Sequence, residues 1–320
     1  MSSLHPTVVG AGIAGVACAR VLSDAGVPVQ VLDRGRRPGG RMGGRTLHGR
    51  AVDLGASYLT VSDDHAAFGR QVADWVTRGL ARPWTDTFAV AGPDGVTGTK
   101  TGPLRYGAQR GLRELVVDLA AGLDVVTGRT VQQVGPGPAV DGEGADAVVL
   151  AMPDPQARRL LQPGSPTETA LDPRGWQPAL AVALGWRTRV WPADLHGAFV
   201  HDSPVLDWLA DDGDRRGDDA PVLVAHTTAD FAARHLDDPA AAGPAVVAAV
   251  CRVLGTDVPP VWTHVHRWTF AKPAAPREQP FSLVDRVGVC GDGWSAPSKV
   301  ESAFVSGHLL GQALLPSTGA

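Results

Sequence analysis

Long hydrophobic runs, blocks of like charge and clustered cysteines are all missing from this 320-residue sequence. No stretch of about 18 consecutive apolar residues could span a bilayer, and the six residues before the first apolar run are too few for a secretory signal. The formal net charge is -4, without a like-charge block that would attract nucleic acid or anionic lipid. We therefore expect a cytoplasmic protein whose partner is a small molecule, not nucleic acid or a membrane.

Only three cysteines are present, Cys18, Cys251 and Cys290, and they lie far apart among apolar neighbours. Their odd number and spacing argue against a disulfide framework or a metal cluster and predict three buried free thiols. The sequence also lacks a Cys or His pair at zinc spacing, a Gly-x-x-x-x-Gly-Lys-Ser/Thr phosphate loop and an arguable Ser-His-Asp order. No metal site is predicted, and hydrolase and ATPase functions are disfavoured.

What is present predicts an α/β protein of two domains, because 320 residues exceed the usual domain of about 100–200. A strand over Thr7–Val9, a helix over Ile13–Asp24 and a strand over Pro28–Asp33 form a βαβ unit, which predicts a parallel sheet. Near the other end, a strand over Val287–Cys290 and a helix over Val300–Leu315 repeat the same order.

The rest of the pattern mixes helices and strands. Residues 34–55 are rich in glycine and arginine and are expected to form a structured loop, and the acidic, glycine-containing segment 211–219 is expected to form exposed turns. Further helices are expected at 64–79, capped by Ser62 or Asp63, at 112–120 and at 245–254, and further strands at 87–90, 123–127, 130–134, 147–151, 179–186 and 222–227.

The first motif that carries chemistry is Gly-Ala-Gly-Ile-Ala-Gly at 10–15, placed between the first strand and the first helix. Gly10 permits a tight turn, Gly12 leaves space for a pyrophosphate, and Gly15 lets helix and strand pack closely. The helix N-terminus supplies free N–H groups and a positive dipole end to the phosphates. This pattern predicts a dinucleotide but does not separate FAD from NAD.

Asp33 closes the second strand, where its carboxylate can accept hydrogen bonds from both ribose hydroxyls of an adenosine. It would repel a 2'-phosphate, although the neighbouring Arg34 keeps NADP as an alternative. A glycine pair, Gly39-Gly40, and Arg41-Met42 follow within ten residues. The glycines let the main chain pass under a long dinucleotide, and Arg41 can pair with its phosphate.

These motifs resemble the FAD family that contains the amine oxidases, protoporphyrinogen oxidase and phytoene desaturase. In that family a closing segment, matched here by Gly291-Asp292 and the helix start at Val300, places an acid near the FAD pyrophosphate and aims a helix N-terminus at the flavin. A weaker match makes Val131 the residue whose backbone touches the adenine. The predicted cofactor-binding residues are Gly10, Gly12, Ile13, Ala14, Gly15, Asp33, Arg34, Gly40, Arg41, Met42, Ala56, Ser57, Val131, Gly291, Asp292 and Val300.

Within that family the sequence is most similar to renalase and its bacterial relatives, flavoproteins that oxidise stray isomers of dihydronicotinamide dinucleotides and pass the electrons to oxygen. The resemblance rests on 53–60, 176–184 and 266–273, of which the middle stretch is the least specific. Where the amine oxidases have a lysine that holds a water beside the flavin N5, this sequence has Ala181. Hydride transfer from an electron-rich dihydropyridine needs stacking over N5 and no strong base, so the missing lysine favours the renalase group.

Tyr58, His266 and Trp268 are the predicted walls of the substrate cavity, with Trp268 as a stacking face; packing in the core is the alternative for each. The remaining histidines considered lack local partners or ligand spacing and are not assigned a role: His196, His201, His226 and His235. The segment 262–281 has no cysteine that could attach FAD covalently, so FAD is expected to bind noncovalently, with His264 and His266 as exceptions.

The resulting hypothesis is an FAD-dependent oxidase of two domains. The FAD domain is assembled from 5–60, 105–158 and 284–316, and a substrate (lid) domain with a mixed sheet and helices from 61–104 and 159–283. The resemblance implies hydride transfer from a dihydronicotinamide-type or other small substrate to flavin N5, with O2 reduced to H2O2. The alternatives are an amine oxidase or desaturase of a secondary metabolite, and a flavin-bound sensor without turnover.

Overall fold

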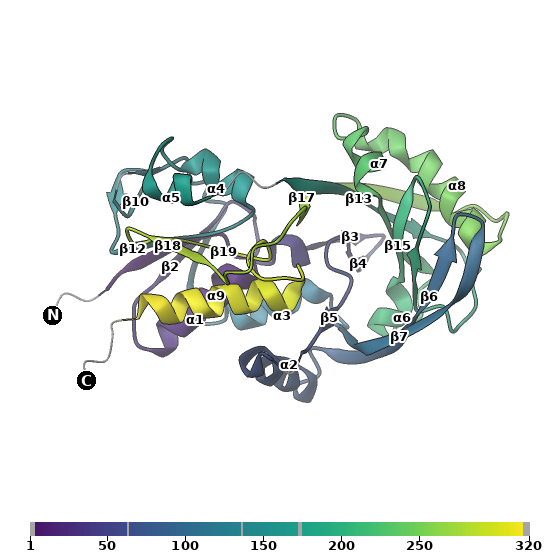
Figure 1. Cartoon of the computed structure of the whole chain (residues 1–320). Coiled ribbons are helices and arrows are strands. Elements are labelled where there is room, and N and C mark those ends of the chain that lie inside the picture. The colour runs from purple at the N-terminus through teal and green to yellow at the C-terminus, as the bar shows by residue number, and fades with distance from the viewer. Residues whose placement is uncertain (1–3, 63, 136, 172–174, 316–320) are drawn as a thin grey trace.

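The computed structural model describes residues 4–62, 64–135, 137–171 and 175–315, which form two lobes side by side (Figure 1). One lobe is built on a six-stranded sheet and holds both ends of the described chain, and the other is built on an eight-stranded sheet. The α/β fold class is thereby confirmed. The numbered domain boundaries stay a prediction.

The six-stranded sheet has the order β18-β19-β12-β1-β2-β8. All neighbouring pairs are parallel except β18 with β19. The central strands are short valine-rich runs buried on both faces, as expected for parallel strands covered by helices on either side. The strands are β1 (Pro6–Val9), β2 (Gln30–Asp33), β8 (Asp124–Thr127), β12 (Ala147–Ala151), β18 (Ser282–Val284) and β19 (Val287–Cys290).

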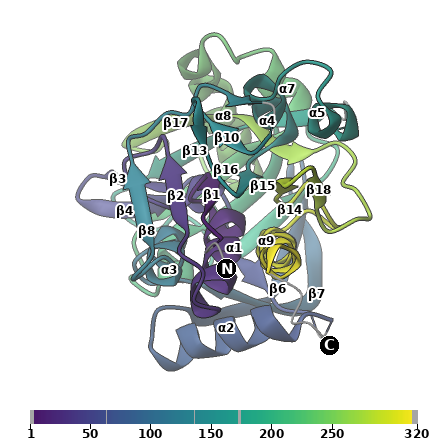
Figure 2. The same cartoon turned by 90° about the vertical axis from the view of Figure 1, so that its left-hand side faces the viewer.

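The first and last helices, α1 (Ile13–Asp24) and α9 (Val300–Leu314), pack against each other on one face of this sheet. Figure 2 shows α9 beside α1, with α9 seen end-on. Their backbones touch, because a Cβ on Gly307 would lie 1.8 Å from the carbonyl oxygen of Ala14. Short helices α4 (Asp154–Leu160) and α5 (Pro166–Ala170) belong to the opposite face.

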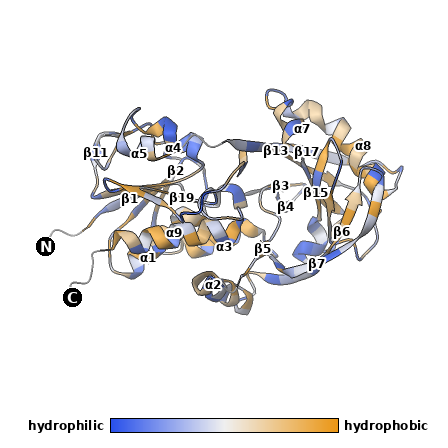
Figure 3. Ribbon diagram, in the orientation of Figure 1, coloured by the Kyte–Doolittle hydropathy of each residue, from blue (hydrophilic) through white to orange (hydrophobic). Residues whose placement is uncertain are grey.

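The second sheet has the order β17-β13-β16-β15-β14-β6-β7-β5 and is mixed, because β14 and β6 pair in parallel. One face is covered by α8 (Gly243–Leu254), which is hydrophobic over most of its length (Figure 3), and by α7 (Ala229–Ala233). The strands are β5 (Leu59–Thr60), β6 (Arg82–Gly92), β7 (Gly95–Gly107), β13 (Trp176–Gly185), β14 (Gly197–Val200), β15 (Leu206–Asp211), β16 (Val222–Thr227) and β17 (Trp262–Pro273).

The remaining elements lie outside the two large sheets, and five of their strands form a three-stranded and a two-stranded sheet of their own. Within the described residues, no helix combines the length and hydrophobicity needed to cross a bilayer. These elements are α2 (Ala66–Thr77), α3 (Leu112–Leu119), α6 (Asp212–Arg216), the 3-10 helices η1 (Gly40–Met42) and η2 (Pro239–Ala242), β3 (Gly44–Leu47), β4 (Arg50–Asp53), β9 (Val134–Gly135), β10 (Ala139–Val140) and β11 (Glu143–Gly144).

Most predicted elements are present, and the helix at 13–24 and the strands at 147–151, 222–227 and 287–290 have the predicted bounds. The predicted strand at 130–134 is wrong, because the N–H groups of Gln132 and Gln133 donate to the carboxylate of Asp141 instead of to a neighbouring strand. Asp63, one of the two predicted caps of α2, lies outside the described residues, and α2 begins after His65.

Two further expectations need correction. Residues 34–55 are not only a loop, because β3 and β4 form a hairpin whose turn, His48-Gly49, has positive φ at both positions as a two-residue hairpin turn requires. The three thiols are free, but Cys251 is only partly buried, whereas Cys18 and Cys290 are buried in the core between α1 and the sheet.

The segment 211–219 was expected to be an exposed turn, and that prediction is wrong for its first half. Asp212, Arg215 and Arg216 of α6 are at most 2% exposed. Arg216 contacts Asp53 at 2.9 Å and Asp212 at 3.0 Å, and Arg215 forms an ion pair with Asp212. Burial acts to raise the pKa of Asp212, but the arginines outweigh it and hold that pKa at about 2. The contact of Arg216 with the distant Asp53, together with the ion pairs inside α6, thus holds in the interior charges that local composition places in solvent.

Asp212→Asn is expected to lower the free energy of unfolding by about 3–5 kcal/mol, because it leaves two buried guanidinium groups without their shared carboxylate. Asp219→Asn, the same change at an aspartate whose side chain is 86% exposed, should change it by less than about 0.5 kcal/mol. Urea denaturation of both variants measures the difference. Equal stabilities of the two variants would contradict a structural role for the α6 ion cluster.

Candidate functional site

The glycine motif at 10–15 joins the carboxyl end of β1 to α1. Gly10 has φ 111°, and a Cβ on it would lie 2.5 Å from the oxygen of Ala151. A Cβ on Gly15 would lie 2.0 Å from the oxygen of Gly10. Both glycines are thus required by the turn and by packing within the protein.

Gly12 is different, because neither its backbone nor its neighbours require glycine. Its φ is -77°, and the nearest heavy atom to a Cβ there is the Cα of Gly40, at 3.8 Å. No side chain caps α1 at Gly12, and its first turn, which includes Ile13 and Ala14, contains no acid. The loop therefore leaves space for an anionic group beside an uncapped helix N-terminus, as a dinucleotide pyrophosphate requires.

Asp33 lies at the carboxyl end of β2, directly beside this loop. Its carboxylate accepts hydrogen bonds from the N–H groups of Ala11, at 2.6 Å, and Gly35. The N–H of Arg129 donates to the Asp33 carbonyl, which brings the chain after β8 alongside. An ionised carboxylate has about four lone-pair sites, so Asp33 keeps capacity for ribose hydroxyls.

Arg41 and Asp292 join the first cofactor motif to the last across 251 residues of sequence. The guanidinium makes a two-pronged ion pair with the Asp292 carboxylate, with one N–H···O distance of 2.9 Å, and also donates to the carbonyl of Ala271 at 3.0 Å. Ser298 donates to the same carboxylate at 2.6 Å. Arg41 thus has a protein partner, and its predicted pairing with a phosphate stays a prediction.

Several other predicted cofactor residues lie around this ion pair. The N–H of Ala56 donates to the carbonyl of Arg41 at 2.9 Å, and Met42 is buried in the adjoining core. Gly291 precedes Asp292 and donates its N–H to the hydroxyl of Ser306 at 2.9 Å. Val300 begins α9 as predicted.

Two predicted residues lie further away. Arg34 is exposed beyond Asp33. Val131 is in a loop, not in the predicted hairpin strand, and its side chain packs in an apolar cluster with Val9 and Leu32. A contact of its backbone with an adenine stays a prediction.

One buried polar atom beside these motifs has no partner. The indole N–H of Trp176, at the start of β13, is buried without a hydrogen-bond acceptor in the described part of the chain. The ring lies 5.1 Å from the guanidinium of Arg41, and a Cβ on Gly293 would lie 3.1 Å from it. Together with the space at Gly12 and the uncapped α1, this orphaned donor fits a long, doubly phosphorylated flavin dinucleotide.

The second sheet contributes one row of side chains to the site. Ala181 of β13 pairs with His266 of β17 on one side and with His226 of β16 on the other, and His226 pairs in turn with Trp208 of β15. Residues directly opposite one another in a sheet point to the same face. The register therefore sets two imidazoles on either side of an alanine.

The segment 54–58 of the first lobe lies against this face. The indole N–H of Trp268 donates to the carbonyl of Leu54 at 2.7 Å, and that of Trp208 donates to the hydroxyl of Ser57 at 3.0 Å. Arg215 donates to the carbonyl of Ser57 at 2.6 Å. Leu54 also packs with Ala181. Contacts from both lobes thus fix the segment that the sequence resemblance had singled out.

The three predicted substrate-wall residues are not equally close to one another. His266 and Trp268 lie on one strand with ring centroids 4.6 Å apart. Tyr58 packs against Phe88 and Trp208, at 5.4 and 5.8 Å, near the His226 end of the row. Burial raises its pKa. Their predicted role as walls of a substrate cavity stays a prediction.

His226 is a residue that the sequence reasoning missed. Burial, with smaller effects of Arg215 and Lys272, lowers its pKa to about 4, and burial with Arg45 and His264 does the same for His266. Both imidazoles are therefore neutral at pH 7. No local pattern in 222–227 signals this position; only the pairing with β13 does. His196 also has a partner, the carboxylate of Asp214 at 2.6 Å.

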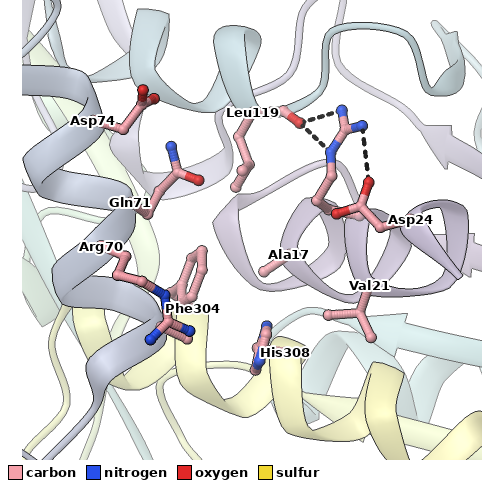
Figure 4. A pocket seen from close by; sticks show the side chains of 11 residues that line it. Ala17, Val21, Asp24, Arg70, Gln71, Asp74, Leu119, Phe304 and His308 are labelled. Atoms are coloured by element: carbon pink, nitrogen blue, oxygen red, sulfur yellow. Dashed lines mark hydrogen bonds and ion pairs between the residues drawn. The ribbon is translucent and has the colours of Figure 1, made fainter.

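A cavity of about 310 Å³ lies elsewhere, between α1, α2 and α9 (Figure 4). Arg20 crosses its edge and donates to the carbonyl of Leu119, and His308 stacks on Phe304 there. It is separated from the glycine motif by the body of α1 and contains none of the predicted site residues. Its position gives it no part in the dinucleotide site.

The Rossmann-type sheet, with the glycine loop and the closing acid beside it, is the arrangement typical of a dinucleotide-binding protein. Residues 8–74 match the NAD(P)-binding Rossmann-like domain, and residues 80–315, well over half of the chain, match the flavin containing amine oxidoreductases. The protein belongs to the family of flavin containing amine oxidoreductases.

Solved structures share its fold at low sequence identity. A provisionally named protoporphyrinogen oxidase from Exiguobacterium sp. 255-15 has a TM-score of 0.76 at 14% identity and covers 98% of this chain and 99% of that one. Cyclohexylamine oxidase from Brevibacterium oxydans has a TM-score of 0.75 at 14% identity, and the match covers 97% of this chain and 98% of that one. Putrescine oxidase bound to putrescine has a TM-score of 0.73 at 15% identity, and the match covers 97% of this chain and 99% of that one.

Curated relatives match over shorter stretches. Phytoene dehydrogenase of Streptomyces griseus is 45% identical over 74 residues, which are 22% of this chain and 15% of that protein. Phytoene desaturase of Rhodobacter capsulatus is 46% identical over 56 residues, 18% and 11% of the two chains. The matches thus span a small part of the length of these relatives.

Gly12→Ala is expected to lower the flavin bound per polypeptide at least tenfold while the thermal midpoint of the apoprotein stays within about 1 °C, because the new methyl group meets no protein atom closer than 3.8 Å. Gly15→Ala is the matched control and should lower that midpoint, because its methyl group would lie 2.0 Å from a carbonyl oxygen. Absorbance near 450 nm and calorimetry measure the two effects. Full flavin content in Gly12→Ala would contradict the proposal that the space beside Gly12 holds the pyrophosphate of the dinucleotide.

Acid should destabilise the fold before most carboxylates titrate. The folded pKa of His226 and of His266 is about 4, whereas the unfolded value is about 6.5. Below pH 6.5 the unfolded chain thus binds more protons, and the free energy of unfolding falls as the pH is lowered toward 4. Chemical denaturation between pH 6.5 and pH 5 should show this slope, and His226→Leu should reduce it. A flat profile in the wild type would refute the low pKa values.

Proposed function

We propose that the protein is a renalase-like oxidase that binds FAD noncovalently and oxidises a dihydronicotinamide-type or similar small substrate, with O2 as the electron acceptor. FAD, when bound, accepts a hydride from the substrate and returns two electrons to O2, which with protons gives H2O2. The observation that carries the proposal is the row His266, Ala181, His226, in which an alanine and two neutral imidazoles face the segment 54–58.

Ala181 supports this choice because the resemblance puts a lysine there in the amine oxidases. A methyl group cannot hold a water or accept a proton, and Ala181 belongs to the same buried apolar cluster as Leu54. Oxidation of an amine requires removal of a proton from the substrate ammonium, and the row offers only imidazoles of low pKa for that task. A dihydropyridine loses hydride without a base, so this face suits it better.

The protein's own residues would bind and orient the substrate. Trp268 and Tyr58 offer flat apolar rings at the two ends of the row, and the hydrogen bond from Trp268 to Leu54 fixes the orientation of one of them. Aromatic walls of this kind exclude water from the reacting atoms. His266 lies between Trp268 and Ala181, where it can position a polar substituent.

Noncovalent binding of FAD is supported by the positions of the thiols. Cys18 and Cys290 pack in the core of the first lobe, where burial raises the pKa of each, and Cys251 lies on α8, on the far face of the second sheet. Cys290 directly precedes the predicted cofactor residues Gly291 and Asp292, but its side chain is fully buried in that core.

An amine oxidase or desaturase of a secondary metabolite is the second candidate. It is favoured by the family match and by the names of relatives and structural neighbours, which include putrescine oxidase and phytoene desaturase. For such an enzyme, the amine or other secondary metabolite would bleach the flavin and a dihydronicotinamide would not.

Anaerobic stopped-flow mixing separates the candidates. Purified holoprotein is mixed with the 2-, 4- and 6-dihydro isomers of NAD, with simple amines and with a polyene, and the flavin absorbance is followed. We expect bleaching by at least one dihydronicotinamide isomer and, after admission of air, one H2O2 per substrate oxidised. Unbleached flavin with every isomer would refute the renalase-like function, and turnover without peroxide would refute O2 as acceptor.

A further inference from the structure

We propose that His226 contacts the substrate and that, with His266 across Ala181, it hydrogen-bonds a neutral polar group such as a carboxamide. The inference rests on the proposed function and adds a specificity-determining residue to it. Sequence reasoning gave His226 no role, and the pairing of β13 with β16 and β17 is what brings the two imidazoles to one face.

The place of His226 follows from its neighbours on both sides. Ala181 flanks it on β13 and Trp208 flanks it on β15. Ala181 packs with Leu54, and the indole of Trp208 bonds Ser57 and packs against Tyr58. His226 therefore faces the segment 54–58, on the same side as His266.

The imidazole has an unused hydrogen-bonding atom. Its Nε2 is buried, and no described residue is its partner, although other atoms of the side chain keep partial exposure. Buried polar atoms in folded proteins nearly always have a partner, and leaving one without costs free energy. Ala181 beside it is fully buried and too short to bond. The geometry thus leaves the partner of Nε2 to a bound molecule.

The charges around the two imidazoles select against a cationic substrate. Burial is the larger cause of the low pKa of both imidazoles, and the positive charges of Arg215 and Lys272 help to lower the pKa of His226, as Arg45 and His264 help to lower that of His266. Lys272 itself lies 3.7 Å from Asp207 at the surface. The buried carboxylates nearest to this end of the site, Asp53 and Asp212, are both paired with arginines. A substrate ammonium would find no free carboxylate among these groups.

A neutral group with both a donor and an acceptor complements two neutral imidazoles. Each neutral ring has one N–H donor and one acceptor nitrogen, and a carboxamide offers an NH2 and a carbonyl. The two histidines stand on strands separated by β13, so their backbones lie about 10 Å apart. Histidine side chains from both strands can therefore reach the two ends of a six-membered ring that carries a carboxamide.

His226→Leu and His226→Gln test the proposal, with His201→Leu, a change of an exposed histidine in the same lobe, as the control. In His226→Leu the KM for the dihydronicotinamide isomer that bleaches the wild type should rise about tenfold, and the affinity for NAD, measured by perturbation of the flavin spectrum, should fall by a similar factor. The glutamine variant, whose amide can reach the place of Nε2, should recover most of this loss.

A second readout does not depend on activity. Replacing an unpaired buried nitrogen with an apolar group of similar size is neutral or stabilising, so the thermal midpoint of the His226→Leu apoprotein should equal or exceed that of the wild type. Flavin content should not change. A lower midpoint or less flavin would show a structural role instead, and an unchanged KM would show no role in binding; either result overturns the proposal.

Failure of the proposed function is visible separately. It is read on the wild type alone, as flavin that no dihydronicotinamide isomer bleaches, before any variant is compared. That outcome would overturn the carboxamide assignment together with the function. If a dihydronicotinamide isomer bleaches the wild-type flavin and His226→Leu binds that isomer as tightly as the wild type does, the result supports the proposed function and refutes only the role of His226.

Discussion

The ion pair of Arg41 with Asp292 is the contact on which the cofactor site depends. It joins the loop after the glycine motif to the segment that follows β19. A second contact between the same two parts of the chain is the close approach of the backbones of α9 and α1 at Gly307 and Ala14. A two-pronged guanidinium–carboxylate pair that is largely buried has little freedom of orientation. The two halves of the site thus have one relative position, whether or not a ligand lies between them.

The second lobe is held to this frame by charges as well as by apolar packing. Arg215 bonds Ser57, and Arg216 bonds Asp53, whose carboxylate also accepts the N–H of Leu112 at the start of α3. The short segment from Asp53 to Tyr58 is therefore fixed by both lobes. Because Trp208 and Trp268 also bond to this segment, it links the first lobe to β17, which carries His266, and to β15, which pairs with the strand of His226.

The sequence predicted the secondary structure around the glycine motif and around Asp292 well, because its signals there are local. Each signal predicts the structure of a few neighbouring residues: the glycines at 10, 12 and 15, the acid at 33 and the strand before Asp292. The βαβ geometry then brings these residues together at one edge of the sheet. The substrate end could not be predicted in the same way. The position of His226 beside Ala181 follows from strand register, and the burial of the α6 charges depends on the contacts of Arg50 with Asp212 and of Arg216 with Asp53, which join segments distant in the sequence.

The position of β19 has a consequence for the newly made polypeptide. This strand pairs with β12 and is followed by Asp292, yet it is synthesised long after β1 and the glycine loop. The βαβ unit at the start is complete long before its partner strand and α9 leave the ribosome. Until β19 and Asp292 have been made, the loop that carries Arg41 lacks its ion-pair partner at the predicted nucleotide site.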